Sequence, residues 1–417
     1  MSAHELQAHI DTISAEIEAQ KEVLSHLERR RGAVQRQLNA IKDPVARLPL
    51  EISSEIFLQC LPSEFQVGET SSYVAPMLLL EVCNAWADIA ISTPGLWAAF
   101  RIVRAYDAKR MGIWFRRART CALTVFVREC IWCPDVALVL KEHSGQLKHL
   151  EIEEGDCELN HLVASGPFPS LETLKIVGLP HEYRGGPPER FSLLELLEIL
   201  RLAPNLVECS FCATLIYCHS EITEILTLPA LRSVKFTPGW LHHPDPHNAA
   251  YILRYLSLPN LHTMSLSSKD LSLGAFSLFL QRSAPPLQTL YLRGSSWDLS
   301  PQPNRPLELA QYLPSLIYLD LHDASANELN SALAELSPTL QTLKVHMTFV
   351  VEGFSFHTLR AALSSRPQLA HFKLLAPFGS QVLEDLEGFR RLEANGMEIY
   401  IGTVMNNLLK PSSTSLM

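Results

Sequence analysis

A leucine phrase that recurs between about residue 120 and residue 402 constrains the fold of this 417-residue chain more than any other feature. The phrase is Leu-x-x-Leu-x-Leu with small apolar substitutions, often preceded by Pro one or two positions earlier. Its instances begin at Leu147, Leu171, Leu206, Leu231, Leu261, Leu287, Leu316, Leu340 and Leu369. Successive instances lie 24 to 35 residues apart, which is typical of stacked structural repeats.

The phrase predicts a short strand in each repeat. Alternate side chains of a strand point to opposite faces, so the last two apolar residues of each phrase share one face, and the first leucine turns in beside them. A single repeat cannot bury these side chains, whereas stacked repeats bury them in one continuous core. We therefore predict one parallel sheet. An earlier, degenerate strand is expected at Leu123-Val125-Val127, and a last one from Met397 to Ile401.

Segments between the phrases have helical spacing and are predicted to cover the convex side of the sheet. They are Leu193 to Arg201, His247 to Tyr255, Leu271 to Gln281 and Ser325 to Leu336. With these features, the chain resembles the leucine-rich-repeat fold over roughly residues 120 to 402. Many such repeats carry Asn eight places after the first leucine. This chain instead has Gly155, Leu179, Thr214, Gly239, Lys269, Ser295, Ala324, Thr348 and Pro377, so we expect an irregular solenoid.

A second informative stretch begins with Leu48-Pro49-x-Glu51-Ile52-x-x-x-Ile56-Phe57. Pro49 suits a first helical turn, which needs no amide donor, and Glu51 favours the positive end of the helix. Ile52, Ile56 and Cys60 recur every four residues along one face. This spacing predicts a short amphipathic helix.

Pro76 opens a second predicted helix, which Ser92-Thr93-Pro94-Gly95 ends and after which Trp97 anchors the exit. Its apolar residues fall at three- and four-residue spacing: Leu79, Val82, Cys83, Trp86, Ile89 and Ala90. The two helices carry more large apolar side chains than fifty-odd residues can hide by themselves. Part of this apolar surface is therefore expected to meet a partner.

At these residues, roughly 44 to 100, the chain resembles the F-box-like domain of fungal-type F-box proteins. That domain docks substrate receptors on the Skp-family adaptor of SCF-type cullin-RING ubiquitin ligases. The resemblance implies these adaptor-binding residues, some as contacts and some as support: Leu48, Pro49, Ile52, Ile56, Phe57, Leu79, Val82, Cys83 and Trp86. One departure is the polar stretch from Ser63 to Ala75, which is longer than the link of compact F-boxes. The alternative is an ordinary helical subdomain with these apolar residues as its core.

Residues 3 to 41 carry a heptad pattern. One core position is filled by Ala3, Ile10, Ile17, Leu24, Arg31 and Leu38, and the other by Leu6, Ile13, Gln20, Leu27, Val34 and Ile41. This pattern predicts a coiled coil about 60 Å long, with a homodimer as one outcome. Arg31 and Gln20 weaken its core, and Gly32 lowers helix stability by roughly 1 kcal/mol relative to Ala. The alternative is a single long helix that folds back on the F-box-like unit.

Composition narrows the functional class. A net charge of -9 and a pI near 6.0 give no electrostatic reason to expect a nucleic-acid partner. No apolar run is long enough to span a bilayer, so no membrane partner is expected, and the N-terminus lacks the pattern of a signal peptide. Nine scattered cysteines fit reduced thiols better than a disulfide framework. We therefore expect a cytoplasmic or nuclear protein.

Motifs for catalysis are weak, and we predict no enzyme activity, no cofactor and no metal site. His4-Glu5-x-x-x-His9 is one residue too long for a zinc-protease helix. Cys130-x-x-Cys133 and Cys209-x-x-Cys212 have zinc-ligand spacing, but they lie on different repeats, and buried reduced cysteine is the preferred interpretation. The histidines of residues 242–247 are interpreted as part of an exposed loop rather than a metal site.

Binding is expected on the concave face of the sheet, where the residues that flank the inward ones must point. The set includes Tyr and Arg, which are enriched at binding hot spots. The candidate target-binding residues are Lys175, Lys235, Tyr291, Arg293, Tyr318, Asp320 and Lys344. A polar, solvated face is, however, what any soluble repeat sheet would present.

The sequence therefore predicts an α/β chain with four parts. Residues 1–42 form a long helix or coiled coil, 43–103 a small all-α F-box-like domain, 104–402 an irregular leucine-rich-repeat solenoid with a parallel sheet, and 403–417 a disordered tail. The hypothesis for function is a substrate-recognition subunit of an SCF-type ligase that binds a Skp-family adaptor, the cullin complex and a target protein. The alternative is a coiled-coil leucine-rich-repeat scaffold without a ligase.

Overall fold

The computed structural model divides into two compact units, Met1–Arg101 with Arg110–Leu123, and Ile102–Lys109 with Thr124–Met417. Residues 110–123 thus belong with the first unit, although the predicted domain boundary lay at residue 103. The residues described are 3–62, 73–102, 107–128, 134–153, 159–178, 190–212, 215–217, 222–237, 249–267, 273–293, 313–322, 329, 333, 337–347, 355–377, 386–403 and 407–409. Most of the predicted tail lies outside them.

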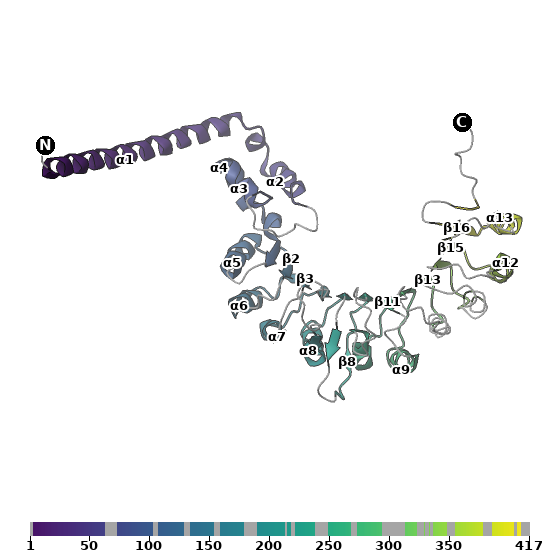
Figure 1. Ribbon diagram of the computed structural model, residues 1–417. Helices are drawn as coiled ribbons and strands as arrows, with labels where there is room; N and C mark the ends of the chain where they lie inside the picture. Colours follow the sequence, from purple (N-terminus) through teal and green to yellow (C-terminus); the bar gives the residue numbers. More distant parts are fainter. Residues whose placement is uncertain are drawn as a thin grey trace, which may run out of the picture. The chain divides into compact units, whose positions relative to one another are not determined.

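The first unit begins with a 40-residue helix and continues with short ones (Figure 1). Its elements are α1 (Ala3–Lys42), η1 (Val45–Arg47), α2 (Leu50–Gln59), α3 (Met77–Val82), α4 (Asn84–Ser92), η2 (Pro94–Trp97), β1 (Ala99–Ile102) and α5 (Asp107–Ala118), the last two of which continue into the second unit. The long N-terminal helix and the helix after Pro49 are confirmed.

The single helix predicted from Pro76 to Ser92 is wrong. Cys83 has extended backbone angles (φ −162°, ψ 168°) and separates α3 from α4. Its carbonyl accepts from the Ala87 N–H at 3.0 Å and so starts α4. The apolar spacing runs through the break without a change of period, which is why the sequence pattern did not reveal it.

An aromatic cluster fills the core of the first unit. Trp97, which is fully buried, lies edge-on to Trp114 with ring centroids 4.8 Å apart, and Phe100 lies 5.3 Å from Trp114. The Trp97 Nε1–H donates to the Ala90 carbonyl at 2.8 Å. Trp97 therefore anchors the exit from α4, as predicted, and α5 supplies Trp114 to the cluster.

The second unit alternates strands with helices. Its first half contains β2 (Leu123–Arg128), α6 (Pro134–Glu142), β3 (Leu147–Glu153), α7 (Asn160–Ser165), β4 (Thr173–Val177), β5 (Arg190–Ser192), α8 (Leu193–Leu202), β6 (Glu208–Cys212), β7 (Leu215–Tyr217), β8 (Leu226–Thr227) and β9 (Ser233–Thr237). Its second half contains η4 (Ala249–Tyr255), β10 (Leu256–Ser257), β11 (Thr263–Ser267), α9 (Leu273–Ser283), β12 (Thr289–Arg293), β13 (Tyr318–His322), β14 (Thr342–His346), α12 (Phe356–Ser364), β15 (His371–Leu375), α13 (Leu386–Ala394) and β16 (Glu398–Gly402).

One sheet of 12 strands runs through the fold in the order β1-β2-β3-β4-β6-β9-β11-β12-β13-β14-β15-β16. Every pairing from β3 to β16 is parallel. Two small parallel pairs, β5 with β7 and β8 with β10, lie outside it. The α/β class, the long parallel sheet and the predicted strands at Leu123 to Val127 (β2) and Met397 to Ile401 (β16) are confirmed. The all-α prediction for residues 43–103 is wrong at its end, because β1 precedes β2 in the sheet.

The predicted phrases align in register across this sheet. The second apolar residue of each phrase pairs with its counterpart in the next repeat, and all are at most 2% exposed. This row of residues, named here the core ladder, consists of Leu150, Leu174, Cys209, Val234, Met264, Leu290, Leu319, Leu343, Phe372 and Ile399. Full burial of each such side chain contributes about 1.5–3 kcal/mol. Stacked repeats therefore share one core rather than nine separate ones.

Helices cover one side of the sheet in the second unit (Figure 1). Helix α8 buries Leu193, Leu196, Leu197, Ile199 and Leu200. The predicted helices at Leu193 to Arg201 and Leu271 to Gln281 are confirmed as α8 and α9, whereas His247 to Tyr255 forms the 3-10 helix η4. Most of Ser325 to Leu336, and all but Pro377 of the positions used to predict irregularity, lie outside the described residues.

A turn with Pro two residues before the first leucine introduces most repeats. In these turns the leucine N–H donates to the carbonyl three residues earlier, as at Leu171 to Phe168 (3.2 Å) and Leu261 to Leu258 (3.4 Å). Proline thus occupies the second turn position, where its fixed φ is favourable and no amide is needed. The same arrangement recurs at Pro204, Pro229, Pro314, Pro338 and Pro367.

Side chains beside these prolines join one turn to the next. The residue after the proline donates to a carbonyl of the preceding turn: Asn205 Nδ2 to Pro169 O at 2.8 Å, Asn260 Nδ2 to Pro229 O at 2.8 Å, and Thr339 Oγ1 to Pro314 O at 2.7 Å. Ser170 Oγ likewise donates to Gly145 O at 2.6 Å. This turn ladder satisfies backbone carbonyls at the entrance to the strands, at a position different from that of the usual buried Asn.

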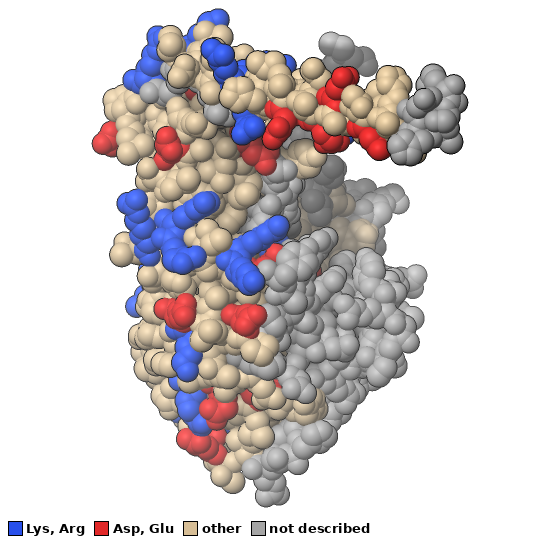
Figure 2. Space-filling model, turned by 90° about the vertical axis from the view of Figure 1, so that its left-hand side faces the viewer, with Lys and Arg blue, Asp and Glu red and all other residues tan. Residues whose placement is uncertain are grey.

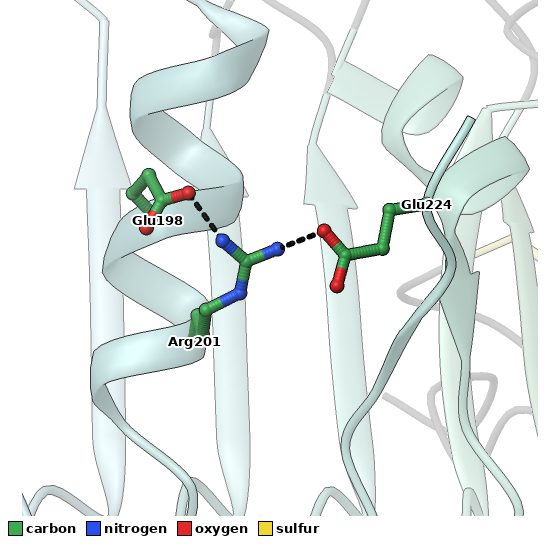
Figure 3. Close-up of polar contacts among 3 residues, drawn as sticks. All are labelled: Glu198, Arg201 and Glu224. Carbon is green, nitrogen blue, oxygen red and sulfur yellow. Dashed lines mark hydrogen bonds and ion pairs between the residues drawn. The ribbon is translucent and has the colours of Figure 1, made fainter. Parts of the chain in front are cut away.

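A surface ion-pair group adds a further connection between repeats. Arg201 of α8 lies between Glu198 of the same helix and Glu224 of the segment that precedes β8, with 2.7 Å between Arg201 and Glu224 (Figure 3). All three side chains are at least 42% exposed. Exposed pairs of this kind contribute about 0.2–1 kcal/mol, so the core ladder outweighs them.

We predict that Asn205→Ala and Asn260→Ala each lower the free energy of unfolding by about 0.5–1 kcal/mol, because each removes one hydrogen bond between turns. Thermal unfolding followed by circular dichroism measures the loss. The converse variant is Ala230→Asn, since Ala230 occupies the same position without a donor, and it should stabilise the fold slightly. Equal melting temperatures for all three variants and the unaltered protein would contradict a role for the turn ladder.

Candidate interaction sites

Helix α2 leaves exposed the face on which the sequence analysis placed Ile52, Ile56 and Cys60. Its buried residues are Ser53 and Phe57, whereas Leu48, Ile52 and Ile56 are 41%, 51% and 40% exposed. A helix on the surface of a globular protein usually turns its apolar face toward the core. Here α2 instead uses Phe57 for the core and leaves Ile52 and Ile56, four residues apart, in contact with water, while Leu48 is exposed just before the helix. We call Leu48, Ile52 and Ile56 the α2 stripe.

Some of the remaining predicted adaptor-binding residues are buried in the core of the first unit, and others are exposed at its surface. Phe57, Leu79 and Cys83 are at most 9% exposed and belong to the core, and Trp86 is half-buried with its ring centroid 5.0 Å from that of Phe57. Val82 is 47% exposed on α3, and Pro49 is exposed. Leu50 and Leu78, which were not singled out in the sequence, are also exposed, at 48% and 43%. The alternative prediction, in which these apolar residues form the core of an ordinary helical subdomain, is therefore wrong for the exposed residues.

The Asp43 carboxylate links α4 to η1. Its carboxylate accepts from Trp86 Nε1, from the Cys83 thiol at 3.9 Å and from the Val45 N–H at 2.9 Å. Ser53 Oγ donates to the Val45 carbonyl at 2.9 Å, which fixes α2 against the same turn. The sequence analysis did not identify Asp43. The sequence signal that could have identified it is the pair Asp43-Pro44, which directly follows α1 and favours a turn.

Helix α1 leaves its heptad residues exposed. Ile10, Ile17, Leu24 and Leu38 of one core position are 55%, 48%, 56% and 41% exposed, and Ile41 of the other is 66% exposed. In this structure the helix thus does not bury its apolar row by folding back on the first unit. The coiled-coil prediction is untested by a single chain.

On the second unit, the face opposite the helices carries a hollow of ≈ 660 Å³ over strands β6, β9, β11 and β12. It brings together three predicted target-binding residues, Lys235, Tyr291 and Arg293. The other lining residues are Val207, Glu208, Arg232, Ser233, His262, Thr263 and Ser265. Three cationic side chains against one carboxylate make this hollow suited to an acidic ligand.

Three further predicted residues, Tyr318, Asp320 and Lys344, meet on β13 and β14. Lys344 Nζ lies 5.1 Å from the centre of the Tyr318 ring, and hydrogen bonding to Tyr318 raises the pKa of Lys344. Burial raises the pKa of Tyr318. Tyr318 also contacts Tyr291, with ring centroids 5.4 Å apart. The last predicted residue, Lys175, lies apart from them and pairs with Glu151 at 2.9 Å.

Asp320 is 8% exposed, which the alternation of the strand did not predict. Its Oδ2 accepts from the Tyr318 hydroxyl at 3.3 Å, while its Oδ1 is buried and has no hydrogen-bond donor. His322 Nε2 and His346 Nε2 each lie 3.5 Å from Oδ1, and the two imidazole rings stack with centroids 4.0 Å apart. Asp320 is therefore an internal, organising residue of this face.

Charges of both signs are interspersed on the face shown in Figure 2. No helix among the described residues is long and apolar enough to cross a membrane.

The Cys209 thiol is buried, and desolvation raises its pKa well above the usual range, so it is an unreactive core residue. Cys130, Cys133 and residues 242–247 lie outside the described residues.

Comparison with known proteins found little. No family model matches the sequence, and no curated protein matches it. Among solved structures, one match is a chain from the crystal structure of the Rad7 and Elc1 complex in yeast. The two chains are 14% identical, the match covers 90% of this chain and 98% of that one, and the TM-score is 0.32.

We predict that Asp43→Ala lowers the free energy of unfolding by about 1–3 kcal/mol, because the Trp86 N–H and the Val45 N–H lose their acceptor. Thermal unfolding of the full chain measures this change. Asp88→Ala, which removes an exposed carboxylate from α4, is the matched control and should be neutral. Equal losses in the two variants would show that Asp43 has no special role.

Proposed function

We propose that this chain is a non-catalytic substrate receptor of an SCF-type cullin-RING ubiquitin ligase. In this proposal the surface formed by α2 and α3 binds a Skp-family adaptor, and the repeat sheet holds a target protein. An associated ubiquitin-conjugating enzyme performs the transfer. The chain contributes by positioning, since a tethered target has a high effective concentration at the reaction site.

The observation that carries the proposal is the exposed α2 stripe. Leu48, Ile52 and Ile56 are aliphatic and 40–51% exposed; Ile52 and Ile56 lie on α2, whose opposite side is fixed by Phe57 and Ser53, and Leu48 directly precedes the helix. Burial of such side chains against a partner is favourable by about 25 cal/mol per Å² of apolar surface. A rigid helix also loses little conformational entropy when it binds. Leu48 and Ile52 fall within the Leu-Pro-x-Glu-Ile opening that resembles the F-box-like domain, and Ile56 follows it by one helical turn.

The hollow around Lys235, Tyr291 and Arg293 is the proposed contact area for the target. Its excess of cationic side chains favours an acidic segment, and Tyr and Arg are the residue types enriched at hot spots. Such a receptor would work in the cytoplasm or nucleus, where ubiquitin ligases act.

The alternative function is a coiled-coil scaffold whose repeats bind a protein without a ligase. The exposed heptad residues of α1 favour it, because ten large apolar side chains of this helix are exposed: Leu6, Ile10, Ile13, Ile17, Val23, Leu24, Leu27, Val34, Leu38 and Ile41. Dimerisation through α1 is also compatible with a ligase role, so adaptor binding decides between the two.

We predict that replacing Leu48, Ile52 and Ile56 together by Ala weakens binding to a Skp-family adaptor by at least about 100-fold, since nearly 3 kcal/mol of apolar contact is lost. Co-expression followed by affinity purification and titration calorimetry measures the change. The control variant replaces Leu138, Leu194 and Leu278, which are 57%, 46% and 63% exposed on helices of the second unit. Adaptor binding that is equal in both variants, or absent from the unaltered protein, would refute the ligase role.

We also predict that the chain dimerises through α1 and that Ile17→Asp with Leu24→Asp makes it monomeric, because two charges would enter the apolar seam. Sedimentation equilibrium measures the mass. Ala8→Asp with Ala15→Asp adds the same charge on the opposite side of the helix and should leave the dimer intact. A monomeric unaltered protein at micromolar concentration would exclude this interface.

A further inference from the structure

We propose that Asp320, His322 and His346 form a binding site for a divalent transition-metal ion of the zinc class. The three side chains lie on the face of the sheet opposite the helices. Asp320 and His322 are alternate residues of β13, and His346 is the register partner of His322 on β14. The inference stands independently of the proposed ligase role, because it depends on these three side chains alone.

The spacing of the ligand atoms fits a tetrahedral ion. One ligand atom from each residue lies within 4.8 Å of the others, and each histidine Nε2 is 3.5 Å from Asp320 Oδ1. Zinc binds imidazole nitrogen and carboxylate oxygen at about 2.0–2.2 Å, which places ligand atoms of a tetrahedron about 3.4 Å apart. Because the lone pair of each Nε2 lies in the plane of its ring, the two imidazoles, now 5° from parallel, must tilt toward each other to share one ion.

The carboxylate itself requires a partner. Asp320 Oδ1 is buried and accepts no hydrogen bond, although a buried carboxylate oxygen without a partner is costly. The two histidine nitrogens at 3.5 Å are too distant for good hydrogen bonds. A bound cation would satisfy this oxygen. The Tyr318 hydroxyl on Oδ2 at 3.3 Å would orient the carboxylate, as outer partners of metal ligands do.

The stacking of the two imidazoles disfavours a state in which both carry a proton. The two rings are stacked with centroids 4.0 Å apart and planes within 5° of parallel, so they would repel each other if both were protonated. Neutral imidazole is the form that binds zinc, copper, nickel and cobalt.

Two neighbouring lysines each lie over an aromatic ring. Lys344 Nζ lies over the Tyr318 ring at 5.1 Å, and Lys373 Nζ lies over the Tyr400 ring at 5.0 Å. On the next strand the register partner of His346 is Leu375, so the ligand set ends at β14. Three protein ligands leave one position of a four-coordinate ion for water or for a side chain of a bound protein.

Zinc titration of the full chain, stripped beforehand with a chelator, tests the inference. The chain has 16 histidines and 9 cysteines, so the difference between variants is diagnostic rather than the total. We expect Asp320→Asn, His322→Asn and His346→Asn each to lose the same single equivalent in calorimetry. His371→Asn is the matched control, because His371 pairs with Glu398 at 2.8 Å on the same sheet as an exposed two-residue pair. It should keep that equivalent.

Histidine nuclear magnetic resonance provides a second readout, in which zinc binding is measured on the unaltered chain and the variants serve only to assign signals. Each imidazole signal is assigned by its absence from the His322→Asn or His346→Asn spectrum. Both signals should shift together when the first equivalents of Zn²⁺ are added, while the His371 signal stays in place. Unshifted His322 and His346 signals at saturating Zn²⁺, or equal zinc stoichiometry in all four variants and the unaltered chain, would overturn the site.

Discussion

Burial of the core ladder is the interaction on which the rest of the structure depends. Each ladder residue lies in register with its counterpart on the neighbouring strand, from Leu150 to Ile399, and none has a sufficient set of apolar neighbours within its own repeat. The parallel sheet, the helices that cover one side of it and the polar character of the opposite side all follow from this constraint. The opposite face is free to vary because it is not needed for the core, and this is where the basic hollow and the Asp320 cluster lie.

The first unit is stabilised in a different way from the repeat sheet. Its helices are short, and stability comes from a few large side chains, the Trp97, Phe100 and Trp114 cluster, and from the hydrogen bonds of Asp43. Because these groups form the core, the α2 stripe is not required for folding and remains at the surface. That separation between supporting and exposed apolar residues is what makes an interaction role physically reasonable for α2.

Two regions on the face of the repeat sheet opposite the helices differ in what they can recognise. The hollow over β6 to β12 is rich in cationic side chains, whereas Asp320 and the two histidines on β13 and β14 offer a donor set for a cation. These regions are neighbours on one sheet but have opposite electrostatic preferences. A protein bound along the repeats would meet both, so its affinity could depend on charge complementarity at one region and on an ion at the other.

The sequence by itself determined the repeats, the register of the strands, the helix after Pro49 and the long N-terminal helix, because apolar periodicity follows directly from local backbone geometry. It could not reveal the break at Cys83, since the apolar spacing is the same with or without it. Nor could it divide the predicted docking residues into buried Phe57 and exposed Ile52, since helical period alone does not say which side faces the core. The burial of Asp320 and its approach to His346 were decided only by tertiary structure, because strand pairing joins residues from different repeats.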